Sequence, residues 1–292
     1  MEPIRILAVV GPTAVGKSAY AVELARRVDG EIVSCDSMQV YREMNIGTAK
    51  PTPAEMGGIP HHLIDIAEPD EPFSCADYVD RAEEAVRGIV ARGKVPVFCG
   101  GTGLYLDRFL RGGVAAPTEC DPDLRRELAE FAAERGNQAL HDRLAAVDPA
   151  SAAAIHPNNT RRVIRALEIF TLTGTPKSVW DRQTRENSPR YLPEVIGLAM
   201  ERDELNRRID ARIDRMMKDG LVEETERLAA KGVFEKNRTA AQAIGYKEIL
   251  PYVRGVCTEA EAVGRLKIAT HQYAKRQMTW FRAKDYVKFT DR

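Results

Sequence analysis

The stretch VVGPTAVGKSAY, residues 9–20, contains the pattern G-x-x-x-x-G-K-[ST], which runs from Gly11 to Ser18. Glycines in this pattern let backbone N–H groups turn toward a phosphate, and the lysine, here Lys17, neutralises its charge. The hydroxyl at the last position typically binds Mg²⁺, so Ser18 is the predicted metal ligand. The predicted phosphate cradle consists of Gly11, Pro12, Thr13, Ala14, Val15, Gly16, Lys17 and Ser18.

Apolar runs and helical patterns alternate around the cradle. Residues 4–10 (IRILAVV), 31–36 (EIVSCD) and 94–101 (KVPVFCGG) predict buried strands. Helices are predicted over residues 16–28 and 76–91. Strands that alternate with helices are typical of a parallel sheet, which binds ligands at the carboxyl ends of its strands. The sequence therefore predicts an α/β fold with a P-loop NTPase-like parallel sheet core.

Two Gly- and Pro-rich segments, residues 111–123 and 185–195, interrupt this alternation. The sequence between them is charged and helical, with no convincing strand, and predicts an inserted all-helical domain. After the second segment, strands are expected over residues 195–200 and at YVKF, residues 286–289, with helices between them. The predicted parts are a core over residues 1–116, an insertion over 117–190 and a second core part over 191–292.

Composition limits the classes of protein and partner. The 292 residues include 44% hydrophobic and 29% charged side chains, as is typical of a globular protein. Lys plus Arg (43) equals Asp plus Glu (43), so a polyanion site needs a local concentration of positive charge. No apolar run approaches the roughly 18 residues of a membrane span, and the five cysteines form no C-x-x-C pair. We expect a cytoplasmic protein, without membrane contact and monomeric by default.

Two polar side chains are expected beside the cradle, at the ends of the second and third strands. Asp36 ends the second strand, where it could bind a metal, act as a general base or be a solvated carboxylate. Thr102, in GGTGLY, stands among glycines that allow close backbone approach, although a glycine turn before a helix is the alternative. The third strand ends without an acid, and no N-K-x-D pattern for guanine is present. A switch GTPase is therefore not expected.

Arg212 is a charge within an apolar stripe. In the helix predicted over residues 203–218, Arg212 projects within about 20° of Leu205 at a rotation of 100° per residue. A guanidinium on a core-facing stripe needs an anion, which could be a leaving diphosphate or a core aspartate in a structural salt bridge. The stripe consists of Leu205, Ile209, Ile213 and Met216.

Two basic regions are candidates for nucleic-acid contact. Arg161 and Arg165 share the outer face of a predicted helix, one turn apart. Residues 265–288 contain seven Lys or Arg and one acid, Asp285, so they could follow a phosphate backbone or form a solvated face. In this second helix the predicted core stripe is Leu266, Ala269, Tyr273 and Trp280, and the opposite, basic face is Lys267, His271, Lys275 and Arg282.

Seven motifs, in order along nearly the whole chain, resemble those of the tRNA dimethylallyltransferases. They are GPTAVGKS, SCDSMQVYREMNIGTAKP, HHLID, GGTGLY, HPNNTRRVIRALEI, AIGYKE and HQYAKRQMTWFR. The resemblance implies transfer of a dimethylallyl group from dimethylallyl diphosphate to the exocyclic amine of the adenosine 3′ of the anticodon in tRNA. It also implies dependence on Mg²⁺, a P-loop core and a helical insertion that grips the anticodon stem-loop.

The resemblance also implies roles for particular residues. Residues 11–18 would bind the diphosphate, and Arg212 would stabilise it as it leaves. Asp36 would be the base oriented on the adenine amine, and Thr102 would lie near the flipped nucleotide. His271 departs from the family pattern, in which an arginine is expected. The implied catalytic residues are Lys17, Asp36, Thr102 and Arg212, and the implied tRNA contacts are Asp36, Ser37, Met38, Gln39, Thr102, Arg161, Arg162, Val163, Ile164, Arg165, Gln242, Ala243, Ile244, Gly245, Tyr246, Lys247, Lys275 and Arg276.

Two other functions explain part of the pattern. A P-loop kinase of a small metabolite would explain residues 9–20 as an ATP site, but neither the insertion nor the basic final helix. A nucleotide-dependent RNA-binding module would explain the basic helix without any transfer chemistry. Transfer of a labelled dimethylallyl group to tRNA distinguishes these three functions.

Overall fold

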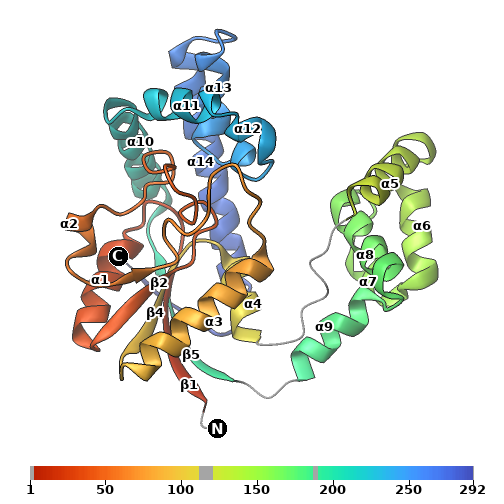
Figure 1. Ribbon diagram of the computed structural model, residues 1–292, viewed down its shortest axis with the longest axis horizontal. Helices are drawn as coiled ribbons and strands as arrows, with labels where there is room; N and C mark the ends of the chain where they lie inside the picture. The colour runs from red at the N-terminus through yellow and green to blue at the C-terminus, as the bar shows by residue number, and fades with distance from the viewer. Residues whose placement is uncertain (1–2, 112–120, 187–189, 292) are drawn as a thin grey trace. The chain divides into compact units, whose positions relative to one another are not determined.

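The structure, a computed structural model, describes residues 3–111, 121–186 and 190–291 (Figure 1). The chain divides into two compact units. The core unit combines Met1–Leu110 with Arg190–Arg292, and the helical unit is Arg111–Pro189. The predicted boundary between residues 116 and 117 lies outside the described residues, so that boundary stays a prediction.

A six-stranded sheet forms the centre of the core unit. Its strands are β1 (Ile4–Val10), β2 (Gly30–Ser34), β3 (His61–His62), β4 (Val95–Gly100), β5 (Tyr191–Ala199) and β6 (Val287–Asp291). They lie in the order β3-β2-β4-β1-β5-β6, and all neighbours are parallel, which confirms the predicted sheet. Val10 pairs with Gly100, and Ser34 pairs with Cys99. The loops that follow β1, β2 and β4 therefore start at one edge of the sheet.

Buried side chains lie on both faces of this sheet, because successive side chains of a strand point to opposite faces. On one face, Val9 and Val97 pack with side chains of α1, α10, α11, α13 and α14. On the other, Ala8 and Phe98 pack with α3 and α4. The helices of the core unit are α1 (Lys17–Arg27), α2 (Pro53–Met56), α3 (Cys75–Ala91), α4 (Gly103–Arg111), α10 (Arg202–Lys218), α11 (Leu221–Ala230), α12 (Val233–Lys236), α13 (Tyr246–Val253) and α14 (Glu259–Arg282), with a short 3₁₀ turn at Ala240–Gln242. None of the described helices combines the length and apolar character that crossing a membrane requires.

β5 begins four residues earlier than its predicted start at residue 195. Pro193 favours a break when it is considered locally, but Tyr191 is buried and the strand pairs with β1 from Tyr191 onward. Pairing with β6 begins only at Val195, so at Pro193 the strand has one neighbour. A proline is tolerated at such a half-free position, because its missing N–H breaks no ladder bond on the open side.

The helical unit has its own apolar core, and its described residues contain no strand. Its helices are α5 (Pro122–Arg135), α6 (Asn137–Val147), α7 (Pro149–Ala154), α8 (Thr160–Thr173) and α9 (Lys177–Glu186). Leu140, Leu144 and Val163 have no exposed surface and lie at the centre of this core. The buried carboxylate of Glu168, on α8, accepts two hydrogen bonds from Arg125 at 2.8 Å and so joins α8 to α5. The fold class predicted from the sequence, a parallel α/β core with an all-helical insertion, is confirmed.

Candidate active site

The phosphate loop, residues 11–18, connects β1 to α1. Positive φ angles at Gly11 (146°), Ala14 (65°) and Gly16 (93°) give the loop its tight turns. A Cβ at Gly11 would lie 2.6 Å from the Leu198 carbonyl oxygen, so glycine is required there for the close approach of β5 as well as for its φ. Loops of this kind direct N–H groups to one side, and the start of α1 adds positive potential. The loop therefore has the geometry of an anion-binding site.

Lys17 begins α1 and folds back over the loop. Its Nζ donates a hydrogen bond to the Pro12 carbonyl oxygen at 2.7 Å. Burial lowers the pKa of Lys17 to about 8, because desolvation disfavours the charged ammonium. The charge of Arg212 acts in the same direction, and the carboxylate of Asp36 acts against both. A bound phosphate would compensate for the lost hydration, so this lysine is suited to an anionic ligand.

Arg212, on α10, lies next to the phosphate loop. The sequence predicted a core-facing side chain, and that prediction is wrong. Its side chain is exposed, whereas the stripe residues Leu205, Ile209 and Ile213 are buried. The buried face of the helix is centred near Ile209 and Ile213, so Arg212 lies at the margin of the apolar stripe. It forms no salt bridge within the described residues, so the structural alternative of a core aspartate is also wrong. Its Nη1 instead donates to the Thr13 hydroxyl at 3.4 Å.

Asp36 follows β2 at the same sheet edge and is half-buried. Its Oδ1 accepts hydrogen bonds from the backbone N–H groups of Met38 (2.9 Å) and Gln39 (3.4 Å), so the carboxylate is held by its own turn. Burial raises the pKa of Asp36, although the backbone donors and the charge of Lys17 lower it. A carboxylate with a raised pKa is a stronger base than a solvated one.

Thr102 connects the end of β4 to the turn that carries Asp36. Its Oγ1 accepts a hydrogen bond from the Ser37 N–H at 3.0 Å and lies 3.4 Å from the Ser37 hydroxyl. The N–H of Thr102 donates to the Cys35 carbonyl oxygen at 3.1 Å. The structure therefore brings the predicted residues of two strand ends together, and it shows that Thr102 positions the turn after β2.

The segment of residues 37–50 is held in part by the side chain of Gln39. Its Nε2 donates to the carbonyl oxygens of Thr48 (3.2 Å) and Ala49 (3.3 Å). Its Oε1 accepts from the Ser34 hydroxyl at 3.4 Å. The amide of Gln39 is thus engaged within the protein, and its predicted contact with tRNA would compete with these bonds.

Glu224, on α11, holds the same segment and was not predicted from the sequence. It is 1% exposed, and its carboxylate accepts hydrogen bonds from the backbone N–H groups of residues 45–47 at 2.9 to 3.2 Å. The Tyr246 hydroxyl donates to it at 2.7 Å. Glu224 stands between the buried Leu221 and Leu228 at helical spacing. An acidic residue on the apolar stripe of a helix was the sequence signal that could have indicated a buried, hydrogen-bonded carboxylate at Glu224.

Two side chains in the predicted tRNA contact over residues 242–247 are turned inward. Those of Tyr246 and Ala243 are buried in the core, at 0% and 3% exposure. The hydrophobic packing of α13 against α11 accounts for both positions. Gln242 and Lys247 are exposed, and their contact with tRNA stays a prediction.

The residues of the predicted contact over 161–165 differ in their exposure. Val163 has no exposed surface and packs in the core of the helical unit. The guanidinium of Arg165 lies 2.5 Å from the buried carboxylate of Glu168. Arg161 and Arg162 are exposed on the same helix. These two arginines are the outward-facing cations at the start of α8.

The predicted basic row on α14 is interrupted by one ion pair and by one close contact between a histidine and an aspartate. Lys267 Nζ lies 2.7 Å from Asp214 Oδ1, and His271 Nε2 lies 2.9 Å from Asp210 Oδ1. Both acids belong to α10, which packs beside α14, so the spacing of charges within α14 could not reveal them. The prediction that these two side chains belong to a free cationic face is therefore wrong. Cations that stay exposed on α14 are Arg265, Lys275, Arg276 and Arg282.

The buried stripe of α14 includes a glutamine that the sequence prediction missed. Gln277 is 5% exposed; its Oε1 accepts from the Thr13 N–H at 2.8 Å, and its Nε2 donates to the Gly101 carbonyl oxygen at 3.1 Å. It lies about 40° from Tyr273 around the helix, so it was a polar residue within the predicted stripe. The buried residues of α14 are Ala262, Leu266, Ala274, Gln277 and Phe281, whereas Ala269, Tyr273 and Trp280 are half-buried.

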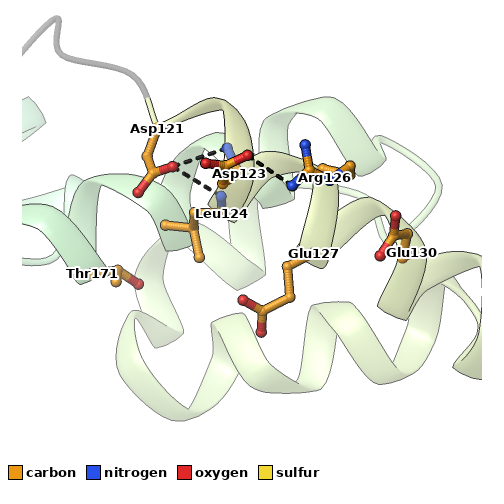
Figure 2. Close-up of a pocket in the computed structure, with 7 residues that line it drawn as sticks. All are labelled: Asp121, Asp123, Leu124, Arg126, Glu127, Glu130 and Thr171. Atoms are coloured by element: carbon orange, nitrogen blue, oxygen red, sulfur yellow. Dashed lines mark hydrogen bonds and ion pairs between the residues drawn. The ribbon is translucent and has the colours of Figure 1, made fainter.

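The helical unit carries an open pocket of about 410 Å³, formed by α5 and Thr171 of α8 (Figure 2). Four carboxylates line it, from Asp121, Asp123, Glu127 and Glu130. Asp121 caps α5 by accepting hydrogen bonds from two N–H groups at 3.0 Å, so acidic residues suit the positive end of this helix. A pocket with this charge does not suit a phosphate.

Comparison with protein families and curated proteins relates the whole chain to one group. A family model described as IPP transferase matches residues 39–284. The chain is 50% identical to tRNA dimethylallyltransferase 1 of Pelobacter propionicus, over 96% of this chain and 90% of that protein. It is 49% identical to a tRNA dimethylallyltransferase of Halalkalibacterium halodurans, over 98% of this chain and 91% of that protein.

Solved structures show the same relation. A full-length tRNA isopentenylpyrophosphate transferase from Bacillus halodurans is similar with a TM-score of 0.72 and 48% identity, over 98% of this chain and 89% of that one. A eukaryotic dimethylallyltransferase acting on tRNA is similar with a TM-score of 0.82 and 29% identity, over 99% of this chain and 74% of that one. The similarity therefore includes both units of the chain.

Proposed function

Because the chain belongs to the IPP transferase family of tRNA dimethylallyltransferases, we propose that it transfers a dimethylallyl group to tRNA. The donor is dimethylallyl diphosphate, and the acceptor is the exocyclic amine of the adenosine 3′ of the anticodon. One arrangement supports this proposal: Lys17 and Arg212 lie at a phosphate loop, and the carboxylate of Asp36 lies at the same sheet edge. The loop and cations suit the leaving diphosphate, and the carboxylate suits the amine.

The diphosphate must be stabilised as it leaves. The bond between the allylic carbon and the donor oxygen breaks, and negative charge develops on the diphosphate. Backbone N–H groups of the loop bind this charge together with the ammonium of Lys17; Pro12 has no N–H, and the N–H of Thr13 is already bonded to Gln277. Arg212 adds its guanidinium from α10, because its bond to the Thr13 hydroxyl holds it beside the loop. If these contacts to the diphosphate form only when tRNA covers the site, water is excluded, and transfer of the dimethylallyl group to water is limited.

We place Mg²⁺ on Ser18, whose hydroxyl stands at the start of α1 directly after Lys17. Ser18 is exposed, and the described part of the chain holds no group of three or more His, Cys, Asp or Glu that could bind a metal. Mg²⁺ commonly keeps several waters and binds substrate phosphates with one or two protein ligands, so a single hydroxyl fits it. When bound, the ion supplies positive charge to the leaving diphosphate.

Asp36 serves as the general base for the amine. An adenine amine is a poor nucleophile, because its lone pair is delocalised into the ring. As the new C–N bond forms, one amine proton must leave, and the Asp36 carboxylate accepts it. The turn formed with Met38 and Gln39 orients the carboxylate before substrate binds. Burial raises the pKa of Asp36, which strengthens the base without a second carboxylate.

The tRNA binds through exposed cations of both units, with the helical unit on the anticodon stem-loop. Phosphate contacts of this kind need accessible Lys and Arg side chains. The acceptor base leaves its stack to reach Asp36, which unmodified tRNA allows most easily in a single-stranded loop. We propose that the enzyme is cytoplasmic and monomeric. The cations that the structure leaves exposed for this purpose are Arg161, Arg162, Lys247, Lys275 and Arg276.

Transfer of a labelled dimethylallyl group from its diphosphate to unmodified tRNA tests the proposed function. The expected result is label on the adenosine 3′ of the anticodon, with one diphosphate released for each transfer. Turnover of ATP with no label on tRNA would instead show a P-loop kinase. tRNA binding without either reaction would show a binding module.

A further inference from the structure

We propose that Gln277 is a positioning residue that holds the phosphate loop in its diphosphate-binding conformation. The inference rests on the proposed function only in assigning diphosphate to the loop. Gln277 belongs to α14 and lies 264 residues from Thr13 in sequence. Its amide connects the loop after β1 to the glycine turn after β4, which are the two backbone segments around Lys17 and Thr102.

The contacts of Gln277 use both ends of its amide. Oε1 accepts a hydrogen bond from the Thr13 N–H at 2.8 Å, in the middle of the loop. Nε2 donates to the Gly101 carbonyl oxygen at 3.1 Å. The residue is 5% exposed, so water does not replace these bonds readily. Gln277 therefore constrains two turns at once, from a helix that belongs to neither.

Only an amide satisfies both partners. Thr13 offers a donor and Gly101 offers an acceptor, and a glutamine head group carries one acceptor oxygen and one donor nitrogen. A glutamate of the same shape could accept from Thr13, but its second oxygen would face the Gly101 carbonyl oxygen without a proton. Its negative charge would also lie beside the loop that binds diphosphate.

Gly101 leaves the space that this amide occupies. A Cβ at Gly101 would lie 2.0 Å from Gln277 Nε2, so any other residue there must displace the amide. The obstructed atom is the end of a flexible side chain, so Gly101→Ala can be accommodated by moving Gln277 rather than the backbone. Gly101 and Gln277 thus form a matched pair that can be tested together.

The loop needs such a constraint because its conformation is strained. Gly11, Ala14 and Gly16 all have positive φ, and a non-glycine residue such as Ala14 adopts it only where the surroundings enforce it. Gln277 fixes the N–H of Thr13, and the Thr13 hydroxyl in turn receives the bond from Arg212 at 3.4 Å. The same amide therefore affects the loop backbone and the placement of the arginine.

Two substitutions of glutamine on one helix test the proposal. Gln277→Glu should weaken the binding of inorganic diphosphate at least about tenfold and raise the KM for dimethylallyl diphosphate, while the Kd for tRNA stays unchanged. Gln272→Glu adds the same charge at an exposed position of α14 and should change neither constant. Thermal unfolding of both variants shows that they are folded. Equal diphosphate affinity in the two variants would overturn the proposal.

Diphosphate binding by Gly101→Ala gives an independent test, which is still available if Gln277→Glu folds poorly. The substitution should weaken diphosphate binding by displacing the amide, and combining it with Gln277→Met should add little, because both remove the same connection. Fully additive effects would overturn the proposal.

Lys17→Ala separates this inference from the proposed function. If the unaltered protein and Lys17→Ala bind diphosphate equally, the loop is not a diphosphate site and both fail; if only Lys17→Ala loses binding, the inference on Gln277 alone is wrong.

Discussion

The phosphate loop and the segment of residues 37–50 leave the same edge of the sheet, but different interactions give them their shape. The loop takes its turns mainly from its own glycines, Gly11 and Gly16, and one of its N–H groups, that of Thr13, is held from outside by Gln277. The segment takes hydrogen bonds at three successive N–H groups from Glu224, which lies 178 residues from Ile46 in sequence. A short motif can therefore be recognised locally, whereas a segment held by a distant buried acid cannot. The two regions should respond differently to substitution.

The largest effect is expected where the two regions meet, at Asp36. Asp36→Asn keeps an oxygen for the N–H groups of Met38 and Gln39, so the turn should persist. It removes the base, and the transfer rate kcat should fall about 10²- to 10⁴-fold while tRNA and diphosphate still bind. Single-turnover transfer and two binding titrations measure these quantities. Loss of tRNA binding in parallel with the rate would make Asp36 a structural residue.

A pH dependence should follow from Lys17 in the loop. Burial lowers the pKa of its ammonium to about 8, so the charged form is present below that pH and is lost as pH rises through it. The kcat/KM for dimethylallyl diphosphate should therefore fall above about pH 8, by up to about tenfold per pH unit. Lys17→Arg keeps its charge and should remove this decline. A decline that persists in Lys17→Arg would assign it to another group.

The segment of residues 37–50 should be weakened without effect on the loop by Glu224→Gln. A neutral amide is a poorer acceptor for three N–H groups and the Tyr246 hydroxyl, so the free energy of unfolding should drop by about 1–3 kcal/mol. The KM for tRNA should rise, while the Kd for diphosphate should not change. Glu226→Gln, at an exposed position of the same helix, is the control. A matching loss of diphosphate affinity would show that the two regions are coupled.

The smallest effect is expected for an arginine of the helical unit. Arg161→Ala should weaken tRNA binding a few-fold and reduce the slope of log Kd against log salt by about one. Arg126, paired with Asp123 at 2.7 Å beside the acidic pocket, is the control, and Arg126→Ala should leave the slope unchanged. Equal slopes in both variants would remove α8 from the RNA-binding surface.

Much of the fold could be predicted because its signals are local. Apolar runs predicted the parallel strands, and the change to charged helical sequence predicted the insertion. The start of β5 was missed, because a proline such as Pro193 locally favours a break in a strand. The structure shows that β5 pairs only with β1 at this position, where a proline is tolerated. The site was predicted at its strand ends, at Asp36 and Thr102, for the same reason: parallel strands place their carboxyl ends at one edge.

The missed and corrected residues have one feature in common, which is a partner on a distant element. Lys267 and His271 meet two aspartates of α10, and Tyr246 is buried against Glu224. Arg212 was placed near the phosphate from a helical stripe, but the packing of α10 leaves it exposed beside Thr13. Helical periodicity gives a residue's direction on its own helix and does not say what packs there.

The sequence by itself determined the phosphate loop, the order of strands and helices along the chain, and the family. These depend on spacing within a few residues, on the conformational freedom of glycine and on the alternation of apolar side chains. Only the tertiary structure decided how the loop and the segment after Asp36 are held. Buried groups such as Gln277 and Glu224 must find hydrogen-bond partners wherever the fold provides them, and the backbone groups that they hold lie more than 170 residues away.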